Sequence, residues 1–400
     1  MRRILPALAA LTVLSSPLFW PVRAAEPQSS RVIVSTTLND SLLFFDASSL
    51  EETQPPLPSR GGGPVRLWIH RTAEHAYLLA ANHGVEGSVG IFDLDGDLVL
   101  ESPASPAPAR AGSVGITAAH TPYGPLVFVT NAWQALGGCG MPNGSVTAFD
   151  AGLLDAGGPL QEVGTVELMG SIPYAVAADG AGNAYASTNC GHSVELLRVR
   201  PNDLDLPEPL GPRYAFEHTG SAIPVQAAPD ATLFDPDRGL LYVANIGGDS
   251  VQAFDLGAPG PGTTIELPGA GPIDASLADS ATGASWIVTS NGQDDSISLI
   301  DRDLVAGCLA AGASVCDAEV ARIPTGVPGG APEGVDYDPL TNRVFVVNKT
   351  IGSPSLSVIQ LGDSPEDGGS VIRTIGLGAL GAASPLPAFI AFDVVVQTRS

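Results

Sequence analysis

The sequence predicts an all-β protein, a seven-bladed β-propeller of four-stranded blades, and three observations support this fold class. The first is a β-hairpin pattern that recurs seven times along the chain. The second is the spacing of these copies, which averages about 52 residues and suits a four-stranded blade. The third is that the two ends of the chain each carry an incomplete copy, and the two complete each other. With 47 Gly and 35 Pro in 400 residues, long helices are not expected.

Each copy contains two short strands of alternating side chains joined by a polar turn. The clearest example is Leu241 to Asn245 followed by Ser250 to Asp255. A short turn between two such runs predicts antiparallel pairing. The other six pairs of strands are expected at 33–36 with 41–46, 77–82 with 88–93, 127–131 with 145–150, 185–189 with 193–197, 286–291 with 296–301 and 344–348 with 355–361.

A further apolar strand belongs to each copy and typically starts at a proline and ends at an Asp. The copy that starts at Ser113 lacks the proline. In a propeller blade this strand would be the innermost one. The seven strands of this kind are expected at 64–70, 113–120, 173–179, 229–235, 272–279, 332–338 and 387–393.

The two ends of the chain predict how the ring closes. The strand at 387–393 has no hairpin after it, whereas the hairpin that starts at residue 33 has no such strand before it. We therefore expect the C-terminal strand to pair into the N-terminal blade, which would leave no exposed sheet edge there. This organisation predicts one propeller domain over residues 25–400 rather than two domains.

The first 24 residues have the pattern of a cleaved secretory signal peptide. Arg2 and Arg3 precede an apolar run, and small residues occur at the positions that a signal peptidase reads before Ala25. A membrane anchor is the alternative, but Pro6 and Pro17 interrupt a segment that would need about 20 continuous apolar residues. We therefore expect a periplasmic or extracellular protein without membrane insertion after cleavage of the signal.

The charge of the chain excludes one class of partner. The formal net charge is −24, and Lys349 is the only lysine in the sequence. Removal of the signal would take away three arginines and no acid, and would change the charge to −27. A basic surface is the electrostatic requirement for binding nucleic acid, so nucleic acid is not an expected partner.

An exported protein with four cysteines is expected to contain disulfides rather than a metal site. Three connectivities are conceivable. Cys308 and Cys316 are close enough in sequence to staple a hairpin, which leaves Cys139 to pair with Cys190. Cys139 lies in an insertion at 132–144, which would be either a lid over the ring or a segment that fastens two blades.

Several strands share a motif that resembles a known family. Tyr242-Val243-Ala244-Asn245, with the related segments at 128–131 and 345–348, resembles the YVTN β-propeller repeat. That family includes microbial surface-layer and secreted propellers, and its fold is similar to that of lactonase-type seven-bladed propellers. The resemblance covers essentially the whole mature chain and implies the fold, but it implies no particular activity. The chain departs from the motif at Thr36, where Asn is expected, and in its less regular fourth copy.

The repeat places a set of polar residues at one mouth of the central channel. In such a blade the inner strand runs away from the face at which it begins and the next strand returns to it, so the prolines and the loops after Asn share that face. Loops from all blades converge there, and convergent polar groups in a concavity are the default binding hypothesis. The candidate ligand-binding residues at the mouth and its rim are Arg66, His83, Tyr174, His192, Asp230, Asp274 and Glu333.

The recurrent Asn and Asp, and the mouth residues, also have a purely structural interpretation. The Asn that ends a strand in six copies is interpreted as a turn residue that bonds its own backbone, and the repeated Asp is interpreted as a turn cap. The mouth residues differ between copies, as a binding site on a symmetric scaffold would, but solvated loop residues differ in the same way. Three carboxylates at one mouth, Asp230, Asp274 and Glu333, would attract cations and raise one another's pKa.

No motif assigns a catalytic centre, a resident metal or a cofactor. The six histidines lack zinc-site spacing, and the chain has no nucleophile elbow, Walker loop, dinucleotide fingerprint or haem-attachment motif. We therefore expect a non-catalytic module that binds an unidentified protein or small molecule at the mouth, with cation binding as one option and no cofactor. The first alternative is a lactonase-like hydrolase or lyase in which a mouth carboxylate or His is the general base and Arg66 holds a substrate carboxylate. The second is a non-catalytic subunit of a periplasmic redox complex.

Overall fold

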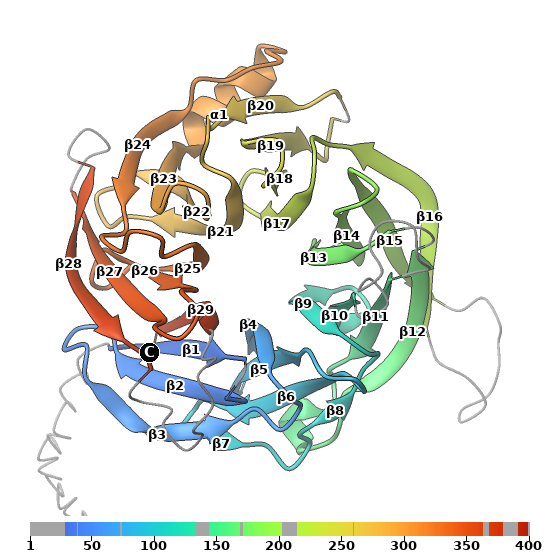
Figure 1. Cartoon of the computed structure of the whole chain (residues 1–400). Coiled ribbons are helices and arrows are strands. Elements are labelled where there is room, and N and C mark those ends of the chain that lie inside the picture. The colour runs from blue at the N-terminus through green and yellow to red at the C-terminus, as the bar shows by residue number, and fades with distance from the viewer. Residues whose placement is uncertain are drawn as a thin grey trace, which may run out of the picture.

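A computed structural model describes residues 29–37, 39–72, 74–132, 144–168, 171–201, 214–258, 260–362, 368–378 and 391–398. Seven antiparallel sheets stand around a common axis like the blades of a fan (Figure 1). The predicted seven-bladed β-propeller is confirmed. The segment predicted as a signal peptide lies outside the described residues.

The blades are numbered from the one that contains both ends of the described chain. Blade 1 contains β29 (Ala391–Thr398), β1 (Ser30–Thr36), β2 (Ser41–Asp46) and β3 (Glu52–Pro58). Blade 2 contains β4 (Pro64–Arg71), β5 (Ala76–Asn82), β6 (Ser88–Asp93) and an outer edge formed by β7 (Leu100–Glu101) and β8 (Ala107–Pro108). Blade 3 contains β9 (Ser113–Thr121), β10 (Gly124–Asn131), β11 (Gly144–Asp150) and β12 (Gln161–Leu168), with the 3-10 helix η2 (Leu154–Ala156) before β12.

The other four blades follow in chain order. Blade 4 contains β13 (Pro173–Ala178), β14 (Asn183–Thr188), β15 (Ser193–Pro201) and β16 (Tyr214–Pro224). Blade 5 contains β17 (Pro229–Asp235), β18 (Leu240–Asn245), β19 (Ser250–Asp255) and β20 (Thr263–Glu266). Blade 6 contains β21 (Pro272–Asp279), β22 (Ser285–Asn291), β23 (Ser296–Asp301) and β24 (Glu319–Pro324), with helix α1 (Arg302–Ala310) before β24. Blade 7 contains β25 (Pro332–Asp338), β26 (Arg343–Asn348), β27 (Ser355–Leu361) and β28 (Gly369–Gly376).

The C-terminal strand closes the ring as predicted. Strand β29 pairs with β1 in an antiparallel register that runs from Ala391 opposite Thr36 to Thr398 opposite Ser30. Figure 1 shows β29, in red, beside β1, in blue. The strand continues beyond Asp393, where it was predicted to end, because β1 offers paired positions as far as Ser30.

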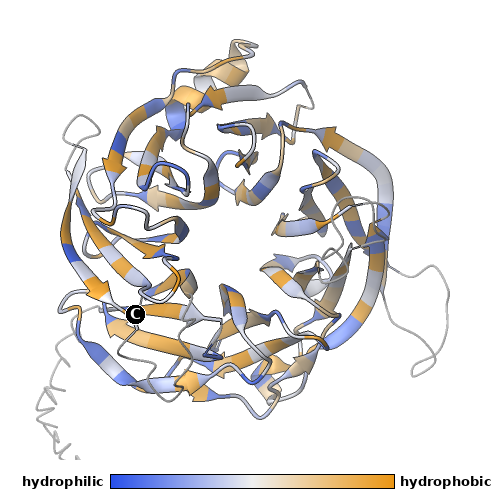
Figure 2. Ribbon diagram, viewed as in Figure 1, coloured by the Kyte–Doolittle hydropathy of each residue, from blue (hydrophilic) through white to orange (hydrophobic). Residues whose placement is uncertain are grey.

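The hydrophobic cores lie between the blades. The described residues form seven apolar clusters, and each cluster joins two neighbouring blades. Both faces of the middle strands are therefore buried, as the burial of every residue of β5 and β18 illustrates. Figure 2 shows hydrophobic residues along the strands of every blade. The cluster that contains Val34 and Phe345 joins blade 1 to blade 7, so apolar packing seals the closure that β29 makes.

The recurrent Asn is structural, but its partner is a serine rather than the turn. In five blades the Asn is at most 3% exposed, and its side-chain amide donates to the hydroxyl of the Ser directly opposite on the next strand. In blade 6, for example, Asn291 Nδ2 lies 2.9 Å from Ser296 Oγ and 2.8 Å from Ser298 Oγ. The interpretation as a turn residue is therefore wrong in mechanism, although two of these amides also bond the carbonyl two residues earlier.

The fourth copy shows a shift of one residue. Asn189 was predicted to end the strand, but β14 ends at Thr188, which lies opposite Ser193 and bonds its hydroxyl at 2.8 Å. The same substitution occurs in blade 1, where Thr36 lies opposite Ser41. A threonine hydroxyl can hydrogen-bond the opposite strand as the longer Asn side chain does, so the pairing persists without the amide.

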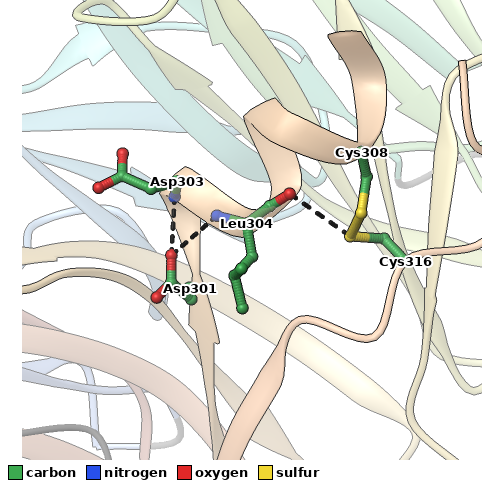
Figure 3. The surroundings of a disulfide bond; sticks show 5 residues. All are labelled: Asp301, Asp303, Leu304, Cys308 and Cys316. Carbon is green, nitrogen blue, oxygen red and sulfur yellow. Dashed lines mark hydrogen bonds between the residues drawn. A yellow bond between two sulfur atoms is a disulfide. The ribbon is translucent and has the colours of Figure 1, made fainter. Parts of the chain in front are cut away.

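The recurrent Asp at the end of the third strand caps the turn that follows it. The Oδ1 atoms of Asp46, Asp150 and Asp255 accept backbone N–H groups two or three residues later. Asp301 does the same for Asp303 and Leu304 and thereby acts as the N-cap of α1 (Figure 3). An Asx turn and a helix N-cap use the same acceptor geometry.

The predicted Cys308–Cys316 disulfide is present. It joins α1 to the segment before β24 (Figure 3), so the bond fastens a helix rather than the predicted hairpin. Helix α1 was not predicted, because a nine-residue segment with an internal Gly307 has too few turns for a helical pattern to stand out. Cys139 and most of the insertion at 132–144 lie outside the described residues, so the Cys139–Cys190 pairing stays a prediction.

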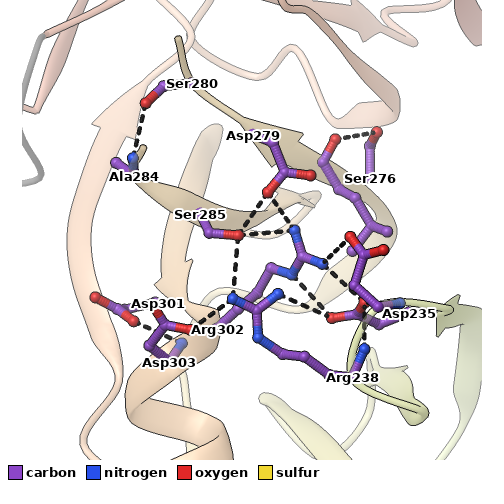
Figure 4. Close-up of polar contacts among 12 residues, drawn as sticks. Asp235, Arg238, Ser276, Asp279, Ser280, Ala284, Ser285, Asp301, Arg302 and Asp303 are labelled. Carbon is purple, nitrogen blue, oxygen red and sulfur yellow. Dashed lines mark hydrogen bonds and ion pairs between the residues drawn. The ribbon is translucent and has the colours of Figure 1, made fainter. Parts of the chain in front are cut away.

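A buried ion pair ties blade 5 to blade 6. Both side chains of the pair Arg302 and Asp235 are fully buried, with 2.8 Å between Nη2 and Oδ1 and 2.9 Å between Nε and Oδ2. Ser285 and Asp279 complete the shell around the guanidinium (Figure 4). Burial would lower the pKa of Arg302, but its contacts with Asp235 and Asp279 outweigh burial and raise it.

Among the described residues, no helix has the length and hydropathy required to cross a bilayer.

Candidate functional site

The inner strands bring the candidate residues together at the face where those strands begin. Pairing of β4, β17 and β21 with their neighbours is irregular directly after the first proline, between Pro64 and Arg66, Pro229 and Ala231, and Pro272 and Asp274. An extra residue at such a bulge re-aims the side chains around it. In these three blades the bulge thus places one polar side chain, Arg66, Asp230 or Asp274, near the channel mouth.

Arg66 reaches across the channel rather than toward solvent. Its Nη1 lies 2.7 Å from Asp274 Oδ2 of blade 6 and 3.5 Å from Asp393 Oδ1 of blade 1. The side chain is only 17% exposed. Burial would lower the pKa of Arg66, but the carboxylates of Asp274, Asp393, Glu333 and Asp230 outweigh burial and raise it above the usual value. Arg66 therefore remains charged and is already paired.

Three other blades carry a small residue where blade 2 carries Arg66. At the position equivalent to Arg66, counted from the start of the inner strand, blades 3, 4 and 5 carry Gly115, Ala175 and Ala231. A Cβ atom added to Gly115 would lie 2.4 Å from the carbonyl oxygen of Tyr174, so this backbone approach requires glycine.

Two carboxylates that sequence analysis did not select complete this part of the channel. Asp393 Oδ2 accepts the backbone N–H of Leu67 in blade 2 at 2.7 Å, and Asp336 Oδ2 accepts that of Val396 in blade 1 at 2.7 Å. These bonds fasten neighbouring inner strands to each other. Burial raises the pKa of Asp393 and raises that of Asp336 to about 6. The available signal was an Asp directly beside apolar residues of an inner strand, Val335 and Tyr337 for Asp336 and Val394 for Asp393.

The residues nearest the mouth are Asp230, Glu333 and Tyr174, together with Lys349. Lys349 Nζ lies 3.3 Å from Glu333 Oε1, and Tyr174 is 40% exposed. Burial, followed by the charges of Asp230 and Glu333, raises the pKa of the Tyr174 phenol, so the three side chains share one electrostatic environment. Five of the seven predicted residues, namely Arg66, Tyr174, Asp230, Asp274 and Glu333, are therefore grouped around one end of the channel.

The surroundings of Asp230 raise its pKa into the range that suits a proton-transfer group. Burial raises its pKa to about 7, the charges of Glu333 and Asp274 add to this, and those of Arg66 and Lys349 oppose it. A carboxyl with a pKa near neutrality can accept or donate a proton at the pH of most compartments. It can equally accept hydrogen bonds from ligand hydroxyl or ammonium groups.

The two predicted histidines lie on loops, and each forms a hydrogen bond with the residue that precedes an inner strand of a blade. His83 follows β5, its backbone N–H donates to Gly63, and burial lowers the pKa of its half-buried imidazole. His192, in the turn between β14 and β15, has a positive φ of 48° and accepts the N–H of Ala228 at Nδ1. The described contacts thus link His192 to the neighbouring inner-strand turn and not to Arg66.

Metal ligation is not indicated by the geometry of this part of the chain. Within the described ranges, no three His, Cys, Asp or Glu side chains are arranged so that they could hold a metal ion. Cation attraction at Asp230, Asp274 and Glu333 stays a prediction.

Comparison with known proteins gives structural but no sequence relatives. No protein-family model matches the chain, and no curated protein matches it. Among solved structures, a periplasmic gluconolactonase of Pseudomonas aeruginosa is 16% identical with a TM-score of 0.63, over 92% of this chain and 99% of that one. A functionally unknown protein of Desulfotomaculum acetoxidans is 11% identical with a TM-score of 0.62, over the same shares. A dihydro-heme d1 dehydrogenase is 14% identical with a TM-score of 0.51, over 90% of this chain and 78% of that one.

At these identities the likeness shows the fold alone, because propellers with one backbone carry many unrelated activities. The chain is a seven-bladed β-propeller whose structural neighbours include a lactonase.

Proposed function

We propose that this protein is an exported propeller that binds a small polyhydroxyl ligand, a sugar or a sugar lactone, at the mouth formed by Tyr174, Asp230 and Glu333. The observation that carries the proposal is Asp230, a partly buried carboxyl that makes no hydrogen bond within the described part of the chain. Such a group is costly to bury without a partner, so a ligand that donates hydrogen bonds to it gains free energy. The half-exposed ring of Tyr174 adds an aromatic surface beside it.

Export and family membership form part of the same proposal. The Cys308–Cys316 disulfide supports an oxidising compartment, and the likeness to a periplasmic lactonase agrees with it. We also infer that the chain is a divergent member of the YVTN-repeat family. The five Asn–Ser pairs support this inference, because they place the last residue of the repeat motif at a fixed structural position.

Lactone hydrolysis is the second candidate, and the pKa of about 7 at Asp230 favours it specifically. In that reaction Asp230 would accept the proton of a water that attacks the ring ester. Arg66 is not assigned the role of holding a substrate carboxylate, because it is paired with Asp274. The role as a subunit of a redox complex stays a prediction.

One experiment separates these functions. D-glucono-1,5-lactone and methyl glucoside are titrated into the wild type by calorimetry, and release of acid from the lactone is followed in a pH-stat. Saturable heat without acid release above the spontaneous rate supports binding alone. Acid release that falls at least about 100-fold in Asp230→Asn, with an activity midpoint near pH 7, supports hydrolysis. The matched control is Asp317→Asn, an exposed carboxylate after α1. Absence of both saturable heat and acid release overturns the proposal.

A further inference from the structure

The central channel contains a cavity of about 560 Å³ that extends from Arg66 away from the mouth. Residues from the inner strands of all seven blades line it, and it extends to His120, Gly180 and Pro236 at the ends of β9, β13 and β17. These ends lie at the face opposite the mouth. Tyr174, Asp230 and Glu333 are not among its lining residues. We call this cavity the inner compartment, and the Arg66–Asp274 pair lies at its end nearest the mouth.

The walls of this compartment are apolar. Trp68, Ile69, Leu233, Leu277 and Val395 line it, and each is partly exposed although the neighbouring strand faces are buried. Partly exposed apolar side chains around one concave space gain free energy when an apolar body fills it. The volume lies in the range of about 300–1,000 Å³ that is typical of small-molecule sites.

The end of the compartment next to Arg66 is polar and carries an excess of negative groups. Asp274, Asp336 and Asp393 line it, against the single guanidinium of Arg66. Asp336 Oδ1 also accepts the hydroxyl of Ser276 at 2.6 Å, so this carboxyl is held in a fixed orientation. When the three carboxyls are ionised, a ligand group that enters here meets acceptor oxygens and an excess of negative charge.

We propose that this compartment is a binding site for a small organic amine, whose ammonium group contacts Asp274 and Asp336 while its apolar body packs between Trp68, Leu233 and Leu277. The ammonium supplies a second positive charge and further hydrogen-bond donors to carboxylates that already accept backbone N–H groups or pair with Arg66. A carboxylate ligand of the same shape is excluded by like charge, and a neutral alcohol leaves the charge uncompensated.

Binding of an amine in this compartment should depend on pH. Burial raises the pKa of Asp336 to about 6 and also raises that of Asp393, so both carboxyls hold protons more tightly than they would in water. The other charged groups at this end of the cavity are Asp274 and Arg66, and His120 lies at the opposite end. An ammonium group favours the ionised carboxylates, so its binding releases protons and its affinity rises between pH 5.5 and pH 8.

The test compares three ligands that differ only in the end group. These are 2-phenylethylamine, 2-phenylethanol and 3-phenylpropanoate, each titrated into the full protein by calorimetry and followed by tryptophan fluorescence, because Trp68 lines the cavity. We expect one saturable site, with the amine at least about tenfold tighter than the carboxylate. Equal or tighter binding of the carboxylate, or no saturable binding of the amine, overturns the proposal.

Variants locate the site. Asp336→Asn should weaken the amine at least about tenfold, because one charged acceptor is lost. Ala119→Trp, a partly buried lining residue near the opening, should weaken the amine and the alcohol alike by obstruction. The control Asp317→Asn should change neither, and Asp230→Asn in the mouth should alter amine affinity less than threefold. Amine binding that survives Ala119→Trp, or that depends on Asp230 as strongly as on Asp336, contradicts the assignment. Failure of glucono-lactone to bind at the mouth would leave this result unaffected.

Discussion

Arg66 of blade 2 pairs with Asp274 of blade 6 across the central channel, with 2.7 Å between Nη1 and Oδ2. The two residues lie on strands that are not neighbours in the ring, since β29 and β25 stand between β4 and β21 on the shorter side. Among the described residues, the other side-chain hydrogen bonds and ion pairs between blades join neighbours in the ring, but this pair spans the bore. One guanidinium thereby links opposite parts of the ring at one end of the channel cavity.

Replacement of Arg66 by Met should destabilise the fold in a way that depends on pH. The change leaves a group of buried carboxylates without their counter-charge, and breaking one side of such a pair typically costs about 3–5 kcal/mol when it is fully buried. Because Arg66 is 17% exposed, we expect about 2–4 kcal/mol at pH 8 and a smaller cost at pH 5, where the carboxylates can take up protons. Urea unfolding at the two pH values measures this.

The control for this prediction is Arg60→Met. Arg60 pairs with Glu101 at the surface, where its side chain is 56% exposed, so the cost should be below about 1 kcal/mol at either pH. An Arg66→Met cost that is the same at pH 5 and pH 8 would mean that the carboxylates do not respond to the guanidinium.

The free energy of unfolding should rise as the pH falls from 7 toward 4. Burial raises the pKa of Asp336 from 3.8 to about 6, so in this range the folded state binds more protons than the unfolded state. Stability then increases on acidification, and for this group the full effect is about 3 kcal/mol. Asp336→Asn should flatten the curve of unfolding free energy against pH, whatever it does to absolute stability. A curve of unchanged slope in this variant would refute the assignment.

The Asn–Ser pairs should each contribute measurably to stability. Asn291→Ala removes three side-chain hydrogen bonds, two to Ser296 and Ser298 and one from the hydroxyl of Thr289, which should cost about 1–3 kcal/mol. Asn189→Ala provides the comparison, because Asn189 lies beyond the end of β14 and Thr188 occupies the paired position. Its cost should stay below about 0.5 kcal/mol. Similar costs for the two variants, measured by chemical unfolding, would contradict the observed register.

Loss of the Cys308–Cys316 bond should lower stability without opening the ring. The bond closes a short loop with a sequence separation of 8, for which the chain-entropy model gives about 2.5 kcal/mol. Because the bond lies within blade 6, we expect a lower melting temperature for Cys308→Ser/Cys316→Ser and an unchanged far-UV spectrum of β-structure. A melting temperature equal to that of the wild type would show that the bond carries no such constraint.

The fold could be predicted from the sequence because its information is local and repeated. Alternation along Leu241 to Asn245 and the turn before Ser250 define one hairpin, and seven copies define the ring. The shift at Asn189 was not predictable in the same way, because a strand end moves by one residue at little cost when Thr188 can bond the opposite Ser.

The candidate site was only partly predictable, for a different physical reason. The repeat placed Arg66, Asp230 and Asp274 at one end of the channel, but it contains no information on which side chains meet across it. That depends on the width of the bore and on which side chains face one another from opposite blades. Asp336 and Asp393 escaped selection because their role depends on contacts with the next blade, which the order of residues within one copy does not reveal.

Because β1 pairs with β29, the blade that is synthesised first is completed only when the last described strand has been made. When a ribosome has produced the first hairpin, nearly the whole remaining chain must follow before the partner of that hairpin exists. Until then one side of β1 presents unsatisfied amide and carbonyl groups, the template on which chains of this kind join one another. Until the eight residues of β29 have been synthesised, a nascent chain therefore avoids association only if a chaperone covers β1 or if synthesis and folding are fast.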